Sequence, residues 1–430
     1  MIKHQRLGLK KNFKKIIGVI GIGYVGLPLA INLSKYFKVI SFDTNKKRVE
    51  ELNRGIDRNL EFNKKQLSLK KIKYTNNYVD LKICNIFIIT LPTPLNKKKP
   101  DISLVLEATK KLAGILKIND MVIYESTFYP GTVDDQLIPI LEKFSKLKYK
   151  KDFFIGYSPE RINPGDKVHT FKNVKKIISA NDKNSLKIIS YIYKKIVKAG
   201  VYKASSIKVA ELSKILENTQ RFINIALMNE ISSLSNKMGL QTKEVIDVAS
   251  TKWNFNKYYP GFVGGHCVAV DPLYLSHKQK SLNLSSSFIK IADKINSNKY
   301  LEVASKLKLA FKKISNKKIL ILGLTFKENC PDLRNSGTMD LVRALNNIKL
   351  KPDLHDPFVE KNELRNNFKY KFNFLKKIKR SNYDCIILSV AHDFYKNMKI
   401  NKLKQISTKA DCIIFDLKSI YKKEEVHYQL

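Results

Sequence analysis

The sequence predicts an α/β protein in which two doubly wound domains, each built on a mostly parallel sheet, are joined by a central helical region. Short apolar runs typical of buried strands alternate with helical patterns over residues 15–200, and this alternation returns over residues 315–430. Between them the chain runs from Ser206 to Met238 without glycine or proline, which indicates one long helix. We therefore expect domains over residues 1–200, 201–314 and 315–430.

The first domain opens with an apolar run, Ile16–Ile22, which leads through glycines into a helical pattern over Leu27–Tyr36. Further apolar runs predict four more strands, at Val39–Phe42, Ile86–Leu91, Val122–Tyr124 and Phe153–Tyr157. The last domain repeats this opening after a second helical stretch from Phe288 to Lys313, with strands expected at Lys317–Leu324, Cys385–Val390 and Cys412–Leu417.

The chain is strongly basic. Lys and Arg outnumber Asp and Glu by 80 to 38, which gives 430 residues a formal net charge of +42. Such a charge is typical of nucleic-acid-binding proteins. The lysines are spread over ordinary helical stretches, however, and no zinc finger, ribonucleoprotein motif or basic stripe interleaved with aromatics occurs. We attribute the charge to compositional drift and expect no nucleic-acid partner, although it would draw anionic ligands from solution.

The cysteines and the apolar runs of the chain indicate in which cellular compartment we expect the protein. Its five cysteines are scattered, odd in number and without paired spacing, which argues against a disulfide framework and a zinc site. Its apolar runs are too short to span a bilayer, and the basic residues 1–15 lack the apolar core of a secretion signal. We expect a soluble cytoplasmic protein without a metal or a membrane partner.

A glycine fingerprint follows the first predicted strand. Glycines permit a tight turn and a close approach of the backbone to a pyrophosphate, which the free N–H groups at a helix N-terminus then hold. Asp43 ends the next strand, where a carboxylate bonds the adenosine ribose and repels a 2′-phosphate, so NAD is favoured over NADP. The alternative is that the glycines serve packing alone. The expected cofactor contacts of this region are Gly21, Gly23, Tyr24, Val25, Gly26, Asp43 and the nearby Arg48.

Cys267 stands in an unusual segment, Tyr259–Pro272, directly after the Gly264-Gly265-His266 triplet and four residues before Asp271. Glycine lets a ligand approach the backbone closely. A cysteine at such a place is a candidate nucleophile if its thiolate is favoured, and the alternative is a buried thiol near a tight turn.

Polar residues also follow several predicted strands. Pro92-Thr93-Pro94, Glu125-Ser126-Thr127 and Ser158-Pro159-Glu160-Arg161 each come after a strand of the first sheet, at the edge where open sheets bind ligands. In the second sheet, the loop from Gly323 to Lys327, with Asp332 and Arg334 further on, carries cations that suit a phosphate.

The long helix carries a polar stripe made of Lys214, Asn218 and Arg221, which share one face at spacings of four and three residues. A lysine and an amide one turn apart suit a developing oxyanion. A solvated face is the alternative interpretation.

Together these segments resemble the nucleotide-sugar 6-dehydrogenases, the UDP-glucose/GDP-mannose dehydrogenase family, over nearly the whole chain after residue 15. The segments that carry the resemblance are Gly21–Gly26, Thr90–Pro94, Glu125–Thr127, Pro159–Glu160, Glu211–Asn218, Gly264–Asp271 and Gly323–Arg334. The stretches Glu217–Glu230 and Gly261–Cys267, Val270 in place of a lysine, and the Ala391-His392 pair resemble the branch that oxidises UDP-N-acetylhexosamines.

This resemblance implies two Rossmann-like domains and an NAD-dependent, four-electron oxidation of the C6 alcohol of a UDP-sugar to a carboxylate, for surface polysaccharide precursors. Cys267 would trap the aldehyde as a thiohemiacetal and then carry a thioester. Hydrolysis would be assisted by Asp271 and Glu160, while Lys214, Asn218 and a water near Thr127 handle charge and protons. The resemblance implies cofactor contacts from Thr93, Thr127 and Arg334. It implies substrate contacts from Glu160–Pro164 (with Arg161), Lys214, Asn218, Arg221, Tyr258–Gly264 and Lys327, and dimerisation through the central helices.

Three other interpretations stay open. The substrate could be UDP-glucose. A β-hydroxyacid or 6-phosphogluconate type dehydrogenase also joins a dinucleotide domain to a helix with a Lys/Asn pair, but needs neither the cysteine nor the second sheet. A basic binding or scaffolding protein could keep the fold without catalysis, which the intact Cys267, Lys214, Asn218 and Asp271 argue against.

Overall fold

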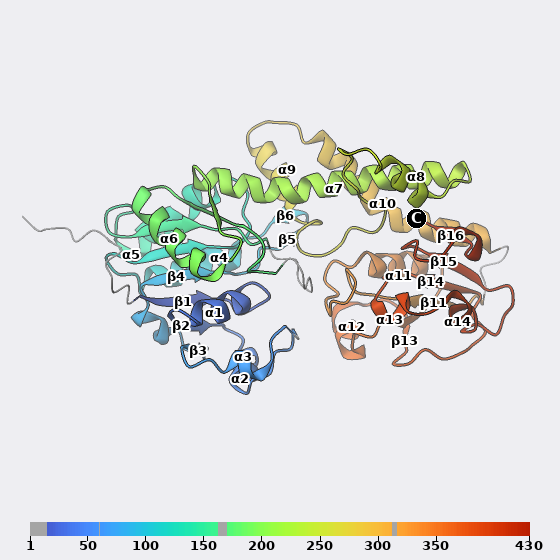
Figure 1. The fold of residues 1–430 in the computed structure, drawn as a ribbon, viewed down its shortest axis with the longest axis horizontal. Coiled ribbons are helices and arrows are strands. Elements are labelled where there is room, and N and C mark those ends of the chain that lie inside the picture. Colours follow the sequence, from blue (N-terminus) through green and yellow to red (C-terminus); the bar gives the residue numbers. More distant parts are fainter. Residues whose placement is uncertain (1–14, 60, 162–169, 312–315) are drawn as a thin grey trace, which may run out of the picture. The chain divides into compact units, whose positions relative to one another are not determined.

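The computed structural model describes residues 15–59, 61–161, 170–311 and 316–430. These form two compact units, the first made of residues up to Glu217 together with Leu273–Leu284, the second of Asn218–Pro272 and Ser285–Leu430. The division falls inside a single helix, α7 (Ile207–Lys237). Figure 1 labels the helices and strands of both units.

The first unit is built on an eight-stranded sheet with the strand order β10-β9-β8-β7-β4-β1-β2-β3. All neighbouring strands are parallel except β8 and β9. The strands are β1 (Ile16–Ile20), β2 (Lys38–Phe42), β3 (Ile72–Thr75), β4 (Ile86–Ile89), β7 (Met121–Tyr124), β8 (Phe154–Tyr157), β9 (Lys176–Ala180) and β10 (Val201–Lys203). A short antiparallel pair, β5 (Leu95–Asn96) and β6 (Lys99–Pro100), stands apart from the sheet.

The core of this unit forms between its apolar strands and the apolar faces of its helices. The inner strands are buried along their length, as expected where helices cover both faces of a parallel sheet. A core of strand and helix side chains includes Ile17, Val39 and Ile123. The helices are α1 (Gly26–Ser34), α2 (Lys46–Asn53), α3 (Lys64–Leu67), α4 (Ser103–Ala113), α5 (Ile138–Ser145) and α6 (Lys183–Ile196), with shorter turns at Tyr78–Ile83 and Val133–Leu137.

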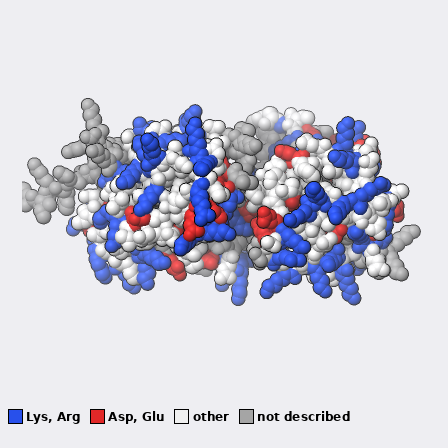
Figure 2. Space-filling model, turned by 90° about the horizontal axis from the view of Figure 1, so that it is seen from below, with Lys and Arg blue, Asp and Glu red and all other residues white. Residues whose placement is uncertain are grey.

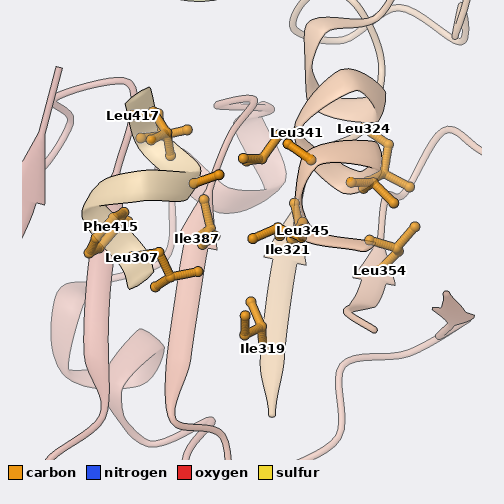
Figure 3. Packing of buried hydrophobic residues seen from close by; sticks show 14 of the residues in the cluster. Leu307, Ile319, Ile321, Leu324, Leu341, Leu345, Leu354, Ile387, Phe415 and Leu417 are labelled. Carbon is orange, nitrogen blue, oxygen red and sulfur yellow. The ribbon is translucent and has the colours of Figure 1, made fainter. Parts of the chain in front are cut away.

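The second unit contains a wholly parallel six-stranded sheet with the order β13-β12-β11-β14-β15-β16. Its strands are β11 (Ile319–Leu322), β12 (Asp353–His355), β13 (Asn373–Phe374), β14 (Cys385–Leu388), β15 (Ile413–Asp416) and β16 (Tyr428–Gln429). The helices that follow β11 in the sequence are α11 (Gly337–Asn347), α12 (Lys361–Asn367), α13 (Asp393–Lys396) and α14 (Ile400–Lys404), with a turn at Lys423–Glu425. Leucines of α11 pack on β11 and β14, where Leu341 and Leu345 lie next to Ile321 and Ile387 (Figure 3).

The two sheets share one topology. In each, the first strand lies between the second strand and a later one, β4 in the first unit and β14 in the second. Ligands bind at such a switch point, outside the carboxyl ends of the strands. The predicted α/β fold with two doubly wound, Rossmann-like sheets is therefore confirmed.

The central segment is helical, as predicted. It consists of α7, α8 (Thr242–Ala249), α9 (Asp271–Ser281) and α10 (Ser287–Ala310). The long helix was expected over Ser206–Met238 and is one residue shorter at each end. The predicted three-domain division stays a prediction, and its limit at residues 314 and 315 lies outside the described residues, as do residues 1–14.

Several strands end earlier than expected because their last apolar residues already belong to loops. The strand predicted over Ile86–Leu91 ends at Ile89, and Thr90 uses its hydroxyl to bond the carbonyls of Ile20 and Gly21. The strand predicted over Cys385–Val390 ends at Leu388 in the same way. These loops are the ones that carry the candidate site.

Candidate functional site

The glycine loop after β1 is shaped by its three glycines. Gly21 has φ of +95°, a conformation that other residues adopt only with strain. A Cβ at Gly26 would lie 1.8 Å from the carbonyl oxygen of Gly21, whereas a Cβ at Gly23 would meet open space. Among the described residues no side chain caps the N-terminus of α1. The loop is therefore compact, and its outer side leaves room for a ligand at a helix N-terminus.

Asp43 lies at the end of β2, as predicted. Its Oδ2 accepts a hydrogen bond from the Ile22 N–H at 2.8 Å, and its Oδ1 accepts one from Asn45 at 2.9 Å. The side chain is half-buried, so the carboxylate both holds the glycine loop and reaches solvent. Loop and carboxylate together fit the pyrophosphate and ribose of NAD.

Arg48 is buried beneath the glycine loop, where it contacts Ile22 and Asp57. Only 5% of it is exposed, and its Nη2 lies 2.9 Å from Asp57 Oδ1 while its Nε donates to the Ile22 carbonyl. Its Nη1 is buried and has no hydrogen-bond partner within the described residues. The contacts of Arg48 in this structure are thus with the protein, and its predicted cofactor contact stays a prediction.

The loops after β4 and β7 lie side by side. The Thr93 hydroxyl donates to the Thr127 carbonyl at 2.9 Å, and the Ser126 hydroxyl donates to the Leu91 carbonyl at 2.7 Å. Tyr274 of α9 also bonds the Thr93 carbonyl, at 2.9 Å. Thr93 and Thr127 are two predicted cofactor contacts that lie 34 residues apart in sequence, and the fold brings them together.

A buried ion cluster lies at the ends of β7 and β8, and the sequence prediction missed its central residue. Lys176 Nζ lies 2.8 Å from Glu125 Oε2 and 2.8 Å from Glu160 Oε2, and Tyr193 donates to the other Glu125 oxygen. Burial raises the pKa of Glu125 to about 7, against the opposing effect of the Lys176 ammonium. Burial lowers the pKa of Lys176, but the two carboxylates outweigh it and the net direction is upward. A charged lysine therefore holds Glu160.

Next to this cluster, Arg161 pairs with Glu217 of α7. The guanidinium Nη2 lies 2.8 Å from Glu217 Oε1, and the pair is partly exposed. The Arg161 N–H donates to Glu160 Oε1 at 2.6 Å. Residues 162–164 of the predicted substrate segment lie outside the described residues.

The N-terminal half of α7 is anchored by a buried acid. Glu211 is fully buried and accepts hydrogen bonds from the N–H groups of Gly131 at 2.6 Å and Val133 at 3.0 Å. Burial raises the pKa of this carboxyl to about 7, while the two N–H groups lower it. Lys214, one turn further on, is only 5% exposed, so it does not belong to a solvated face.

In the second unit, Cys267 lies in a turn that ends at the start of α9. Its carbonyl accepts hydrogen bonds from the N–H groups of Val270 at 3.1 Å and Asp271 at 2.9 Å. Cys267 is exposed, while the other four cysteines are buried. Asn218 donates from Nδ2 to Asp271 Oδ2 at 2.5 Å, so these two predicted residues are brought together. Arg221, on the same helix, is exposed.

The glycine-rich part of the Cys267 loop packs against the loop after β11. A Cβ at Gly264 would lie 2.6 Å from the Asn335 carbonyl oxygen, and a Cβ at Gly265 would lie 2.8 Å from the Phe326 ring. Asn335 Nδ2 donates to the Gly265 carbonyl at 3.0 Å. Close backbone packing is therefore the local reason for both glycines.

The predicted cations of the second sheet lie in the loop after β11. Lys327 is half-buried, and its Nζ lies 5.8 Å from the centre of the Phe326 ring. Arg334 forms a two-point ion pair with Asp332, through Nε at 2.9 Å and Nη2 at 2.6 Å. Tyr258, another predicted substrate residue, donates its hydroxyl to Gln220 of α7 at 2.8 Å.

Asp356, which the sequence prediction missed, follows β12 as Asp43 follows β2. Its Oδ2 accepts hydrogen bonds from the N–H groups of Leu324 at 2.6 Å and Thr325 at 3.2 Å, and it lies 2.9 Å from His392 Nε2. The His392 Nδ1 accepts from the Asn329 N–H at 2.9 Å, so the imidazole presents its proton to the carboxylate. Both side chains are completely buried. Asp356 could have been predicted from the sequence, because the second sheet repeats the strand-loop-helix-strand pattern of the first and Asp356 stands where Asp43 stands in that pattern.

Three further features bear on nucleic-acid, metal and membrane binding. On the face drawn in Figure 2, Lys and Arg side chains are spread over each unit rather than gathered in one patch. In the part of the chain that the structure describes, no group of His, Cys, Asp and Glu side chains is arranged to hold a metal ion. None of the helices in that part is long and apolar enough to cross a membrane.

Comparison with known proteins agrees with this arrangement. Residues 15–197 match the NAD binding domain of the UDP-glucose/GDP-mannose dehydrogenase family, residues 208–298 its central domain, and residues 320–423 its UDP binding domain. The UDP-N-acetyl-D-glucosamine 6-dehydrogenase of Pseudomonas aeruginosa is 42% identical over 420 residues, which cover 96% of this chain and 99% of that protein. The enzyme of the same name from Salmonella typhi is 41% identical, with coverages of 96% and 98%.

Solved structures show the same likeness. The UDP-D-ManNAc dehydrogenase of Pyrococcus horikoshii superposes with a TM-score of 0.87 at 29% identity, covering 96% of this chain and 98% of that one. The matches extend over all three segments, and they agree with the glycine loop and Asp43 on the cofactor. The chain therefore belongs to the UDP-glucose/GDP-mannose dehydrogenase family and is an NAD-dependent nucleotide-sugar 6-dehydrogenase.

Proposed function

We propose that this enzyme oxidises the C6 alcohol of a UDP-N-acetylhexosamine to the carboxylate, with Cys267 as the nucleophile that carries the intermediate. The observation that carries the proposal is the exposed Cys267 in the turn that ends at Asp271, whose carboxylate accepts a hydrogen bond from Asn218 of α7. The amino-sugar substrate is supported by the relatives of 42% and 41% identity, both named for UDP-N-acetyl-D-glucosamine. Val270 and His392, which suit the amino-sugar branch, agree with this choice.

The cofactor would be held by Gly21, Gly23, Tyr24, Val25 and Gly26 with Asp43, and by Thr93 and Thr127 at the neighbouring strand ends. When bound, NAD supplies a hydride acceptor for each of the two oxidations. The chain's own task is to place C6, to move protons and to keep the aldehyde from escaping.

Cys267 performs the covalent part of the reaction. After the alcohol has lost a hydride and a proton, the sulfur adds to the aldehyde carbon and a proton reaches the former carbonyl oxygen, which gives a thiohemiacetal. Loss of a second hydride and the hydroxyl proton leaves a thioester. Water then adds to the thioester carbon, the C–S bond breaks, and the carboxylate and the free thiol result.

Asp271 and Glu160 are proposed to assist that hydrolysis by accepting a proton from water. Asp271 is suited to this role because Asn218 fixes its carboxylate, and Glu160 because Lys176 and the Arg161 N–H fix its two oxygens. Lys214 and Asn218 would stabilise negative charge on the C6 oxygen.

The remaining predicted residues are proposed to bind the ligands. Lys327 supplies a cation for the diphosphate, Arg221 lies toward the sugar, and Arg334 reaches the cofactor. The rest of the substrate contacts would come from Arg161, Tyr258, Gly261 and Gly264.

We also propose a homodimer formed through the central helices, in a cytoplasmic enzyme that makes surface polysaccharide precursors. Support for the dimer comes from large apolar side chains that α7 and α10 leave exposed, including Leu216, Leu227 and Leu234 on α7 and Phe288 and Ile291 on α10. Such faces are usually covered in the assembled protein.

The test is to incubate the purified protein with NAD and, separately, UDP-GlcNAc, UDP-GalNAc, UDP-glucose and GDP-mannose, while NADH formation is followed. The proposal expects two NADH for each UDP-N-acetylhexosamine consumed. Preference for UDP-glucose would favour the UDP-glucose 6-dehydrogenase alternative. One NADH per substrate would contradict the four-electron reaction, and salt-sensitive nucleic-acid binding without NADH would favour the binding-protein alternative.

A further inference from the structure

The loop from Gly261 to Asp271 runs along α7 and touches it at two asparagines. Asn218 bonds Asp271 at one end, and Asn229 bonds Gly261 at the other. These asparagines are eleven residues apart, which is three helical turns or about 16 Å. Ten residues of chain can span about 33 Å when extended. The loop therefore has about twice the length it needs, so the position of Cys267 depends on the hydrogen bonds that hold the loop, which include those of Asn218, Asn229 and Asn335.

Asn229 holds the loop through two hydrogen bonds to the backbone of Gly261. Its Oδ1 accepts the Gly261 N–H at 2.9 Å, and its Nδ2 donates to the Gly261 carbonyl at 3.1 Å. The same Nδ2 donates to Asn296 Oδ1 of α10 at 2.9 Å, and Asn296 in turn donates to the Phe222 carbonyl of α7. Every polar atom of the Asn229 amide group is thus used, and the residue is only 1% exposed.

The surroundings keep this amide in place. Lys299 of α10 is buried, and its Nζ donates to the main-chain carbonyl of Asn229 at 3.1 Å. On the loop itself, Val263 and Val268 pack against the apolar cluster of Phe222, Ala226 and Ala292. The segment from Gly261 to Val268 therefore packs against side chains of α7 and α10 and is hydrogen-bonded to α7 by Asn229.

We infer that Asn229 is a positioning residue, which sets the place of Cys267 for the covalent step by clamping the backbone of Gly261. The inference rests on the proposed role of Cys267. Nothing in the local helix pattern requires an amide at this position, because α7 continues through it unbroken. The clamp acts through the loop backbone, so its loss would move the thiol without removing any group that touches the substrate.

The test uses the full chain with Asn229→Ala and a matched control, Asn236→Ala. Asn236 lies on the same helix and also donates from Nδ2 to a distant main-chain carbonyl, that of Gln429, at 3.1 Å. Each variant loses a hydrogen bond from the α7 amide to a distant main-chain carbonyl, but of these two asparagines only Asn229 bonds the Cys267 loop. Hydrogen–deuterium exchange of a peptide covering residues 259–268 is measured together with kcat and KM for UDP-GlcNAc, below the melting temperature of each variant.

For Asn229→Ala we expect amide exchange in that peptide to rise tenfold or more and kcat to fall tenfold or more, while NAD binding stays within twofold. Asn236→Ala should also lower the melting temperature but keep wild-type exchange in the loop and kcat within twofold. If Asn229→Ala does not yield folded protein, Asn229→Ser, which removes the two-point contact but keeps a small polar group, carries the same expectations.

Unchanged loop exchange in the Asn229 variant, or raised exchange with wild-type kcat, would overturn the inference. A loss of activity that the Asn236 variant shares would overturn it as well, because that loss would reflect general stability. Cys267→Ser is assayed alongside. If it forms two NADH per UDP-GlcNAc, the proposed thiol route fails and the positioning role fails with it. If Cys267→Ser is inactive but Asn229→Ala is not, the positioning role alone fails.

Discussion

The Nδ2 of Asn218 lies 2.5 Å from the Oδ2 of Asp271, which joins the polar stripe of α7 to the turn that carries Cys267. Only 1% of Asp271 is exposed, so its carboxylate depends on this amide for part of its hydrogen bonding. Because α9 begins at Asp271, the pair also fixes the direction in which the chain leaves the Cys267 turn. The orientation of this carboxylate therefore depends on a residue 53 positions away in sequence.

Cys267→Ser should abolish formation of the uronic acid while leaving substrate binding largely intact. A serine hydroxyl is a far weaker nucleophile than a thiolate at neutral pH, so the covalent step fails. The measurement is product analysis together with isothermal titration of UDP-GlcNAc. Cys330→Ser, at a buried cysteine of the same unit, is the matched control and should keep its activity. Full turnover by Cys267→Ser would refute the thioester route.

Asp271→Asn should lower kcat by roughly a hundredfold or more, because it keeps the shape of the side chain but removes the proton acceptor. The thioester on Cys267 should then accumulate, which intact-protein mass spectrometry after rapid quenching would detect. Asp247→Asn serves as the control, since Asp247 lies in the same unit and its ion pairs with Lys243 and Lys257 are exposed. A wild-type kcat for Asp271→Asn would remove the residue from the mechanism.

Lys176→Met should both destabilise the protein and reduce its activity. Removing the cation leaves Glu125 and Glu160 buried close to each other, which costs about 3 kcal/mol and drives one of the two to hold a proton. Glu160 would then no longer be held as a carboxylate. Urea denaturation and steady-state kinetics measure the two effects, with Lys175→Met at the exposed neighbouring position as control. Equal behaviour of the two variants would show that the buried cluster does not matter.

Glu211→Gln should change how stability depends on pH. In the folded protein, burial raises the pKa of Glu211 from its ordinary value of 4.5 to about 7, so the folded state holds this proton more tightly than the unfolded state. The wild type therefore loses stability as pH rises from about 4.5 to 7, by about 3 kcal/mol from this group. A glutamine does not titrate and should remove that slope, at a constant cost of about 1 kcal/mol for the weaker acceptor.

Urea unfolding of both proteins at pH 5 and pH 8 tests this expectation. Relative to the wild type, Glu211→Gln should have nearly the same stability at pH 5 and be about 2 kcal/mol more stable at pH 8. The same difference at both pH values would mean that Glu211 has an ordinary pKa in the folded protein.

The sequence predicted those features that depend on local rules. The glycine loop and the turn at Cys267 were predicted from their glycines, of which Gly21 and Gly265 have positive φ. Asp43 was predicted from its place at the end of the strand that follows the glycine loop. The Asn218–Asp271 contact was not predicted as such, but both residues were named because each belongs to a recognisable segment.

Residues that act through distant partners gave no such signal. Lys176 meets Glu125 and Glu160 across 51 and 16 residues of sequence, and one lysine is inconspicuous in a chain with a net charge of +42. Arg48 lies where a cofactor contact was expected, yet its guanidinium turns inward to Asp57. Asn229 occupies an ordinary helix position, and only the folded loop at Gly261 gives its amide a partner.

The repeated sheet has a consequence for nucleotide binding. Both halves of the chain place an aspartate after their second strand, and both use it to receive an N–H group from the loop opposite. The Asp43 carboxylate is partly exposed, but the Asp356 carboxylate is completely buried next to His392. The Asp356 carboxylate is therefore not available to the ribose of a dinucleotide, which agrees with the match of residues 320–423 to a UDP binding domain rather than to a second NAD binding domain.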